Sequence, residues 1–368
     1  MRHLSRIFEP LLRLKPGTRG PQRVRRPAKP IKKRTPRTPP RVTVLVTLSC
    51  LLVILAAFSM SWVAAAWVWS ADLVTLFQPW LVIAAGALMF ACLIARTRLL
   101  LIASIILSAN VLVMAAPWLR SLDRPPHTGR VLTVATFNIL YNNTDVRPFL
   151  LWARRSTPDL IAVQEVADPW GAAFETLKDT HPYSARVVAH LSYAPIDLLS
   201  RYPIKSAEYY WIDQNRVALT AIVNVDGQDI ESTILHPPSP RDPDLWRERN
   251  YYFMRVATAA GWAGHGPPPP SARMVRLALG DFNATRWSPH FQNFLRQTEL
   301  YDADHSWSPR TTRVLMRYDD WVIGAPIDHV LISRGVRSLG CQAGPFLGSD
   351  HLPLTCRLEY PLAPPPRR

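Results

Sequence analysis

Three long runs without a charged residue, at 42–70, 73–95 and 99–119, constrain this chain more than any other feature. A helix needs about 20 apolar residues to cross the hydrocarbon core of a membrane, and each run is long enough. A cleaved signal peptide would explain only the first run, which is too long for one. Buried core helices of this length rarely lack charge on every face. We therefore predict three transmembrane helices.

The basic residues predict how these helices are oriented. Residues 1–41 contain fourteen Lys and Arg against one acidic residue, so this tail carries +13 of the formal net charge of +16. Cytoplasmic loops are enriched in Lys and Arg, so the tail is expected in the cytoplasm. The loop at 70–72 has no basic residue and is expected outside, while Arg96 and Arg98 keep the second loop inside. Three spans then place everything that follows them on the outer side of the cell membrane.

The segments around the spans have their own compositions. The tail at 1–41 is rich in Arg and Pro, which predicts disorder. Two roles stay open for it: binding of anionic lipid headgroups, or a topogenic signal alone. Residues 120–130 form a linker of at most about 36 Å when extended, at about 3.3 Å per residue. One catalytic domain is expected at 131–360, and a flexible end at 361–368.

Charge and cysteine content narrow the class of the outer domain. With the tail removed the chain is nearly neutral, which argues against the basic track that a nuclease needs. Cys50 and Cys92 lie in the predicted spans and are interpreted as packing residues. For Cys341 and Cys356 we favour two buried free thiols over a disulfide, although an oxidising compartment would permit the disulfide.

From residue 131 onward, short apolar runs alternate with amphipathic segments, a pattern typical of an α/β domain. The strands are expected at 131–137, 160–164, 196–199, 218–225, 230–235, 276–279, 327–332 and 352–358. The helices are expected at 146–155, 170–178, 245–260 and 289–297. About 230 residues of this kind suit one domain with a substantial core.

Six polar clusters accompany these strands, most of them at a strand end. They are Thr-Phe-Asn at 136–138, Gln-Glu at 164–165, His236, Gly-Asp-Phe-Asn at 280–283, Ile-Asp-His at 327–329 and Ser-Asp-His at 349–351. Strand ends are where such a fold presents side chains to a cleft. Carboxylates, amides and imidazoles converging there could hold a divalent cation, a phosphate and a water, a combination that hydrolyses phosphate esters.

Each cluster offers one part of that chemistry. Glu165 directly follows an apolar strand and is a natural ligand of Mg²⁺, which prefers one or two carboxylates and keeps several waters. Asn138 could support the metal or a phosphate oxygen. Asp281 could orient or deprotonate a water, with Asn283 holding that water or a phosphate oxygen.

The two Asp-His dipeptides supply the imidazoles. A histidine needs a carboxylate on its far nitrogen to fix its tautomer, and Asp328 could serve His351 in this way. Successive strand residues point to opposite faces, so we expect His329 to turn away from Asp328 and to be structural. His236 is a second candidate for contacting the phosphate; the alternative is a turn residue before Pro237.

Taken together, the ordered motifs resemble the endonuclease/exonuclease/phosphatase superfamily of metal-dependent phosphoesterases over about 131–360. Leu-Ser-Arg-Tyr-Pro-Ile at 199–204 belongs to the same set. The resemblance implies a four-layer αββα sandwich with the site at the top of its two sheets. The three spans further resemble the bacterial membrane-anchored branch of this superfamily. Asp197 departs from the pattern, because an apolar residue is usual there, and leaves the register of its strand in doubt.

The resemblance also implies roles for the site residues. The metal-site positions are matched by Asn138, Glu165 and Asp350, and the metal is expected to be Mg²⁺, with Mn²⁺ also suited to oxygen ligands. The positions that act on water and phosphate are matched by His236, Asp281, Asn283, Asp328 and His351. In this scheme Asp281 aligns the attacking water, and His351, oriented by Asp328, contacts the phosphate.

These observations predict a membrane-anchored, extracytoplasmic, Mg²⁺-dependent phosphoesterase that uses in-line attack of water. The substrate is expected to be a lipid-linked phosphate or pyrophosphate, or a phospholipid headgroup, because the linker holds the domain near the membrane. An exported nuclease is a less favoured alternative, and a catalytically inactive membrane binding protein is another. The oligomeric state is left open.

Residues after His236 are expected to help with such a substrate. Three basic side chains could grip further phosphate oxygens, namely those of Arg241, Arg247 and Arg249. Three aromatic side chains could touch the membrane interface or pack inside a helix, namely those of Trp246, Tyr251 and Tyr252.

Overall fold

The computed structural model describes residues 40–119, 129–187, 195–213, 215–259, 274–306, 310–318 and 321–361. The expectations for the tail at 1–41, the linker at 120–130 and the end at 361–368 fall almost entirely outside these residues. By its internal contacts the chain divides into units at 1–43 and 44–368. All contacts described below lie within the second unit.

Three helical segments are long and apolar enough to cross a membrane, as predicted: Arg41–Ala64, Trp69–Ile94 and Leu100–Pro117. They are formed by α1 (Pro40–Ala64), α2 (Trp69–Val74) with the short 3₁₀ turn η1 (Thr75–Phe77) and α3 (Gln78–Ile94), and α4 (Leu100–Leu119). Pro79 stands in the first turn of α3, where its missing N–H costs nothing. The helices bury a small apolar cluster among themselves and expose many other apolar side chains, as lipid-facing helices do.

The rest of the described chain forms two six-stranded sheets and a ribbon. The first sheet has the order β13 (Arg337–Ala343), β14 (Leu354–Pro361), β1 (Gly129–Asn138), β2 (Leu160–Gln164), β4 (Ile196–Ser200) and β3 (Tyr183–Arg186). The second has the order β5 (Ile204–Trp211), β6 (Val217–Val225), β7 (Gln228–Leu235), β8 (Val275–Asp281), β12 (Asp328–Ser333) and β9 (Leu300–Asp302). The strands β10 (Arg313–Tyr318) and β11 (Trp321–Ala325) pair with each other as a two-stranded ribbon.

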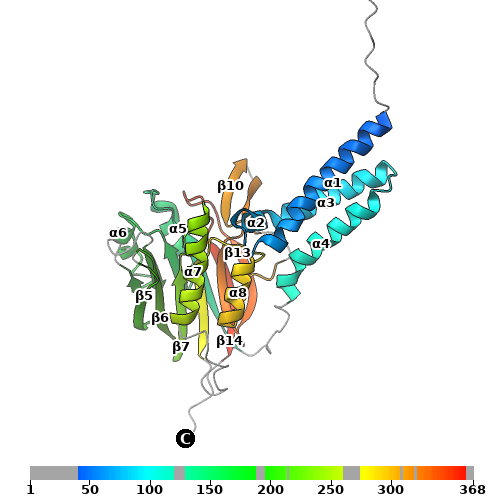
Figure 1. The fold of residues 1–368 in the computed structure, drawn as a ribbon. Coiled ribbons are helices and arrows are strands. Elements are labelled where there is room, and N and C mark those ends of the chain that lie inside the picture. Colours follow the sequence, from blue (N-terminus) through cyan, green and yellow to red (C-terminus); the bar gives the residue numbers. More distant parts are fainter. Residues whose placement is uncertain are drawn as a thin grey trace, which may run out of the picture. The chain divides into compact units, whose positions relative to one another are not determined.

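The two sheets and four helices stack in four layers. Apolar side chains of both sheets form the central core, among them Leu132, Leu198 and Leu277. A second cluster packs α5 (Arg147–Ser156) and α6 (Trp170–Glu175) on the first sheet. A third packs α7 (Pro243–Ala259) and α8 (Pro289–Thr298) on the second sheet, and Figure 1 shows these two helices over it. The predicted αββα sandwich is confirmed.

Strands with little buried apolar surface escaped the sequence pattern. These are β3, β5, β9, β10, β11 and β13. In β5 nearly every residue is exposed or half-buried, so no alternation of apolar and polar residues marks it. Edge position in a sheet therefore accounts for most of the omissions.

Two features of the first sheet bear on the expectations from the sequence. The pairing of two cysteines contradicts one expectation, and the contact of Asp197 settles a register that was in doubt. Cys341 and Cys356 lie opposite each other on β13 and β14 and are joined by a disulfide, so the expectation of free thiols was wrong. The antiparallel register of those strands brings the two side chains together. Asp197 lies on β4 opposite Arg186, whose Nε is 2.6 Å from its Oδ2. A cross-strand ion pair thus explains a carboxylate inside an apolar strand and fixes the register.

Candidate active site

Five strands deliver polar residues to one end of the sandwich. The parallel strands β1 and β2 end together at Asn138 and Gln164. The parallel strands β7 and β8 also end together, just beyond Leu235. β12 runs antiparallel to β8 and begins with Asp328 opposite Asp281. A Cβ at Gly280 would lie 1.9 Å from the carbonyl oxygen of Leu235, so only glycine allows β7 and β8 to approach here.

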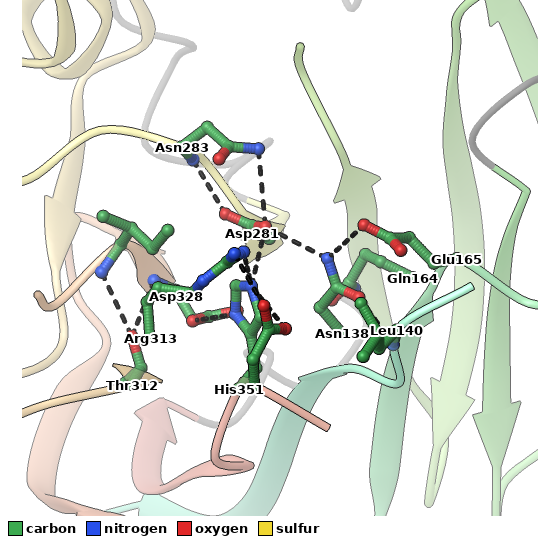
Figure 2. Close-up of polar contacts among 12 residues, drawn as sticks. Asn138, Leu140, Gln164, Glu165, Asp281, Asn283, Thr312, Arg313, Asp328 and His351 are labelled. Carbon is green, nitrogen blue, oxygen red and sulfur yellow. Dashed lines mark hydrogen bonds and ion pairs between the residues drawn. The ribbon is translucent and has the colours of Figure 1, made fainter. Parts of the chain in front are cut away.

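Asp281 lies at the centre of the cluster, with its side chain 1% exposed. Its Oδ2 accepts a hydrogen bond from Asn138 Nδ2 at 3.1 Å and lies 3.5 Å from His351 Nε2 and 3.8 Å from His236 Nε2. Asn283 donates its backbone N–H to Oδ1 at 2.8 Å. Figure 2 shows Asp281 between Asn138 and His351. Burial raises the pKa of Asp281, and the charge of His351 opposes that rise.

Asn138 and Glu165 form one side of the site. Asn138 Nδ2 also donates to Glu165 Oε1 at 2.9 Å, while its Oδ1 accepts the backbone N–H of Leu140 at 3.0 Å. Tyr141 donates its backbone N–H to Glu165 Oε2 at 2.8 Å. Burial would raise the pKa of Glu165, but His236 and these hydrogen bonds outweigh it and lower that pKa. The carboxylate is therefore held in its charged form.

The backbone is strained at this side of the site. Glu165 and Leu140 have φ values of 63° and 67°, in the left-handed region that non-glycine residues seldom adopt, and Asn283 has 49°. Such conformations cost about 1–3 kcal/mol each and persist where surrounding contacts hold them. Here the contacts of the site itself hold them.

Asp328 and His351 form the expected dyad. Asp328 Oδ2 lies 2.9 Å from His351 Nδ1, and both side chains are at most 1% exposed. The backbone N–H of Asp328 donates to Thr312 Oγ1 at 3.1 Å, which fixes the strand start. Burial opposes the charged ring of His351, yet Asp328 and Asp281 outweigh burial and raise the pKa of His351 to about 9.

The remaining two histidines have different surroundings. His329 lies between Asp302 Oδ2 at 3.0 Å and the carbonyl oxygen of Ala284 at 2.9 Å, on the opposite face of β12 from Asp328. His236 lies at the site, with Nε2 3.6 Å from Glu165 Oε1, and its buried Nδ1 has no hydrogen-bond partner in the described part of the chain. Burial lowers the pKa of His236, and the charges of Glu165 and Asp281 oppose that shift.

Arg313 and Asp350 close the outer side of the cluster. Arg313 Nη2 lies 2.6 Å from Asp350 Oδ2, and Nη1 lies 2.9 Å from His351 Nε2. This second contact suits a neutral His351, whereas the two carboxylates favour the charged ring. The carboxylates prevail, because Arg313 is 35% exposed and can turn away while Asp328 and Asp281 are buried. No motif of the sequence marked Arg313, which arrives from the β10–β11 ribbon.

The donor set fits a hard divalent cation. Four carboxylates gather here, those of Glu165, Asp281, Asp328 and Asp350. The positively charged side chain of Arg313 and the ring of His351 lie among these four carboxylates. Among the described residues, the buried Oδ1 of Asp350 has no hydrogen-bond partner. Carboxylate oxygens are the ligands that Mg²⁺ and Mn²⁺ prefer.

One group of these residues has ligand atoms close enough together to hold an ion, and two further carboxylates are more exposed. Ligand atoms of Asp281, Asp328 and His351 lie within 4.8 Å of one another. Asp328 and His351 are already bonded to each other, however, and all three are buried. Glu165 and Asp350 are 23% and 33% exposed, which gives a hydrated ion access. Glu165 and Asp350 are therefore the more accessible carboxylates of the cluster.

Among the basic and aromatic residues after His236, only Arg249 departs from the expectation. Arg249 is buried and does not reach outward, and the exposed Arg247 pairs with Asp244. Tyr252 is also buried, and its hydroxyl donates to the carbonyl oxygen of Val217 at 2.7 Å. Arg241 and Tyr251 are exposed. The expectation that Arg249 grips a phosphate was wrong, because its guanidinium is enclosed by protein.

Comparisons with known proteins agree with this geometry. The family model described as Endonuclease/Exonuclease/phosphatase family matches residues 135–351. Among curated protein sequences none matches the chain. At the identities below, solved structures show the likeness of fold alone.

Three solved structures illustrate that likeness. Humanized D. rerio TDP2 with 14 mutations is 14% identical, with a TM-score of 0.50 over 62% of this chain and 99% of that one. An endonuclease/exonuclease/phosphatase from Beutenbergia cavernae DSM 12333 is 18% identical, with a TM-score of 0.50 over 64% of this chain and 73% of that one. The Bacteroides thetaiotaomicron VPI-5482 mannosyl-6-phosphatase is 14% identical, with a TM-score of 0.49 over 62% of this chain and all of its own.

Proposed function

This chain belongs to the endonuclease/exonuclease/phosphatase family, whose members are generally phosphoesterase hydrolases that need a divalent metal, and we propose that it hydrolyses a phosphate ester or pyrophosphate of a membrane lipid on the outer face of the cell membrane. The observation that carries the chemistry is the convergence of six separate sequence clusters around Asp281. The candidate membrane spans support the location.

In the proposed mechanism, water attacks phosphorus opposite the leaving oxygen. Asp281 accepts a hydrogen bond from this water and aligns it, while Asn283 and Asn138 keep the Asp281 carboxylate in place. His351, charged because of Asp328, donates to a non-bridging phosphate oxygen. His236 faces the same space from the other side and is the second donor to phosphate.

Glu165 and Asp350 are the proposed metal ligands, with Asn138 as support. Asn138 donates to Glu165 and so orients that carboxylate, and its own oxygen is occupied by Leu140. A bound Mg²⁺ supplies Lewis-acid stabilisation of charge on the phosphate and the leaving oxygen. The left-handed backbone at Glu165 is part of this preorganised arrangement.

The sequence and the contacts support an extracytoplasmic location in independent ways. The basic tail favours a cytoplasmic N-terminus, so three spans put the domain outside. The Cys341–Cys356 disulfide suits an oxidising compartment. Asp72 and Thr75, at the start of the second candidate span, contact the domain, which supports placing that end of the span and the domain on one side. Alkaline phosphatase fused after Arg368 should be active in intact cells; an inactive fusion beside an active cytosolic reporter would contradict this topology.

The enzymatic test uses full-length protein in detergent with a polyprenyl pyrophosphate, a phospholipid and duplex DNA, each with Mg²⁺ or with chelator. We expect lipid turnover that the Asp281→Asn and His351→Ala variants lose by about 10²-fold or more. Asp244→Asn is the matched control, because Asp244 is an exposed aspartate on α7. Turnover of DNA alone would replace this proposal by an exported nuclease. No turnover of any of the three would favour a binding protein.

A further inference from the structure

A buried ion pair joins the membrane segment to the catalytic domain. Arg249 on α7 is 2% exposed, and its Nη2 lies 2.5 Å from Asp72 Oδ2 on α2. The same Asp72 oxygen accepts a hydrogen bond from Trp246 Nε1 at 2.9 Å, and Asp72 is 3% exposed. Burial of two charges is costly, and Asp72 Oδ1 has no hydrogen-bond partner among the described residues, so a gain in stability does not by itself account for this pair.

The other arm of the guanidinium reaches the site. Arg249 Nη1 donates to the carbonyl oxygen of Asn283 at 3.1 Å. Asn283 in turn donates its backbone N–H to Asp281 Oδ1 at 2.8 Å and its side-chain amide to the carbonyl oxygen of Pro237 at 3.1 Å. Asn283 has a left-handed φ of 49°, and the contact with Arg249 is one of those that hold its backbone.

Further contacts bind the membrane segment to the same two loops. Trp69 Nε1 donates to the carbonyl oxygen of Pro240, four residues beyond His236. Thr285 Oγ1, two residues beyond Asn283, lies 3.3 Å from the carbonyl oxygen of Thr75. Both loops that carry site residues on this side therefore rest on residues 69–77.

We infer that Arg249 is a positioning residue for Asp281, acting through Asn283, and that Asp72 holds Arg249 in place. The membrane segment at 69–77 is then a structural part of the active site as well as a tether. This inference rests on the proposed function only for its effect on turnover. The contact chain from Asp72 to Asp281 predicts a change in local protection whatever the substrate is.

The experiment measures hydrogen–deuterium exchange and turnover on the full-length protein in detergent. The variants are Asp72→Asn, Arg249→Met and Arg249→Lys. The matched control is Arg247→Ala, because Arg247 lies on the same helix but is exposed and pairs only with Asp244 among the contacts of the described residues. Trp69→Phe removes one donor to the loop after His236 without removing a charge, and serves if the charge variants fold poorly.

In Asp72→Asn and Arg249→Met we expect peptides spanning 280–287 to exchange at least about tenfold faster than in wild type, since the loop loses its support. We expect kcat with the lipid substrate to fall by about 10²-fold, because a displacement of Asp281 by about 1 Å can have an effect of that size. KM should change much less. Arg249→Lys should recover part of the rate, because an ammonium can reach one acceptor but not both. The double variant Asp72→Asn with Arg249→Met should be no slower than Arg249→Met alone, because Asp72 acts through Arg249.

A purely structural anchor gives a different pattern. All variants would then lower the thermal midpoint while kcat and exchange at 280–287 stayed as in Arg247→Ala, and that result would overturn the inference. If wild type and His351→Ala turn over lipid equally, the proposed function fails. Exchange at 280–287 would still decide the inference in that case, because the measurement needs no substrate.

Discussion

Replacement of Asp328 by Asn tests the electrostatics of the site most directly. The change removes a buried charge 2.9 Å from His351 Nδ1 and keeps the shape of the side chain. In wild type, burial opposes the charge of His351, but Asp328 and Asp281 outweigh it and raise the pKa of His351 to about 9. Loss of one neighbouring opposite charge lowers a pKa by about 1–3 units. The pKa of His351 in the variant is therefore expected at about 6–8.

The sign of the pH effect follows from the role of the charged ring. A histidine is charged below its pKa, so wild-type kcat should hold up to about pH 9 and fall above it. If the pKa of His351 is about 7 in Asp328→Asn, only about a tenth of the His351 rings stay charged at pH 8. That change alone lowers kcat about tenfold. Loss of the orienting hydrogen bond adds to this, for a total of about 10²–10³-fold.

The assay is kcat against pH from 5.5 to 9.5 at saturating Mg²⁺ and substrate, with Asp244→Asn as the control. The upper limb of the variant should move to lower pH by at least one unit. An upper limb that stays near pH 9 in Asp328→Asn would refute the argument, because His351 would then not owe its charge to Asp328. Equal activity at every pH would refute a role for the dyad altogether.

Three further predictions concern the framework that holds the site. Gly280→Ala should lower the free energy of unfolding by about 3 kcal/mol in urea titrations, because the new Cβ would lie 1.9 Å from the Leu235 carbonyl oxygen. Replacing both Cys341 and Cys356 by Ser should cost about 3 kcal/mol, given their separation of 15 residues, whereas reductant should leave the double variant unchanged. Burial raises the pKa of Asp197 from 3.8 to about 6, so wild type should lose up to about 3 kcal/mol as pH rises from about 4 to 6 and its carboxylate ionises. Asp197→Asn should lack this loss; an identical pH dependence in the variant would contradict it.

Much of the candidate site was visible in the sequence because chemistry and strand ends coincide there. Glu165 and Asp281 each follow a run of buried apolar residues, so their place at the rim of a sheet could be predicted from periodicity. The opposite facing of Asp328 and His329 followed from the alternation of strand side chains. The order of the motifs along the chain identified the remaining site residues.

Arg313 shows where such reasoning stops. It begins an exposed ribbon, and nothing in its neighbours marks it as a site residue. It reaches His351 and Asp350 because two backbone hydrogen bonds join the ribbon to the site, from the Val314 N–H to the carbonyl oxygen of Asp350 and from the Leu352 N–H to that of Thr312. A pairing between segments this far apart depends on packing, which leaves no local pattern.

Tertiary contacts also decide the role of Arg249, a residue that the sequence analysis did single out. Its charge suggested a phosphate ligand, but its burial beside Asp72 assigns it to the protein's own framework. Similarly, the sequence analysis favoured free thiols at Cys341 and Cys356, and only the register of β13 on β14 brings the sulfurs together.

The sequence by itself determined the properties that are local along the chain: three helices long and apolar enough to cross a membrane, strands ending in carboxylates, and a basic tail from which an orientation can be predicted. These depend on the periodicity, length and charge of continuous segments. The tertiary structure decided which distant segments meet, namely Asp72 with Arg249, Arg313 with His351 and Cys341 with Cys356. Such contacts depend on sheet register and on how two sheets and the membrane segment pack, and those are properties of the whole fold.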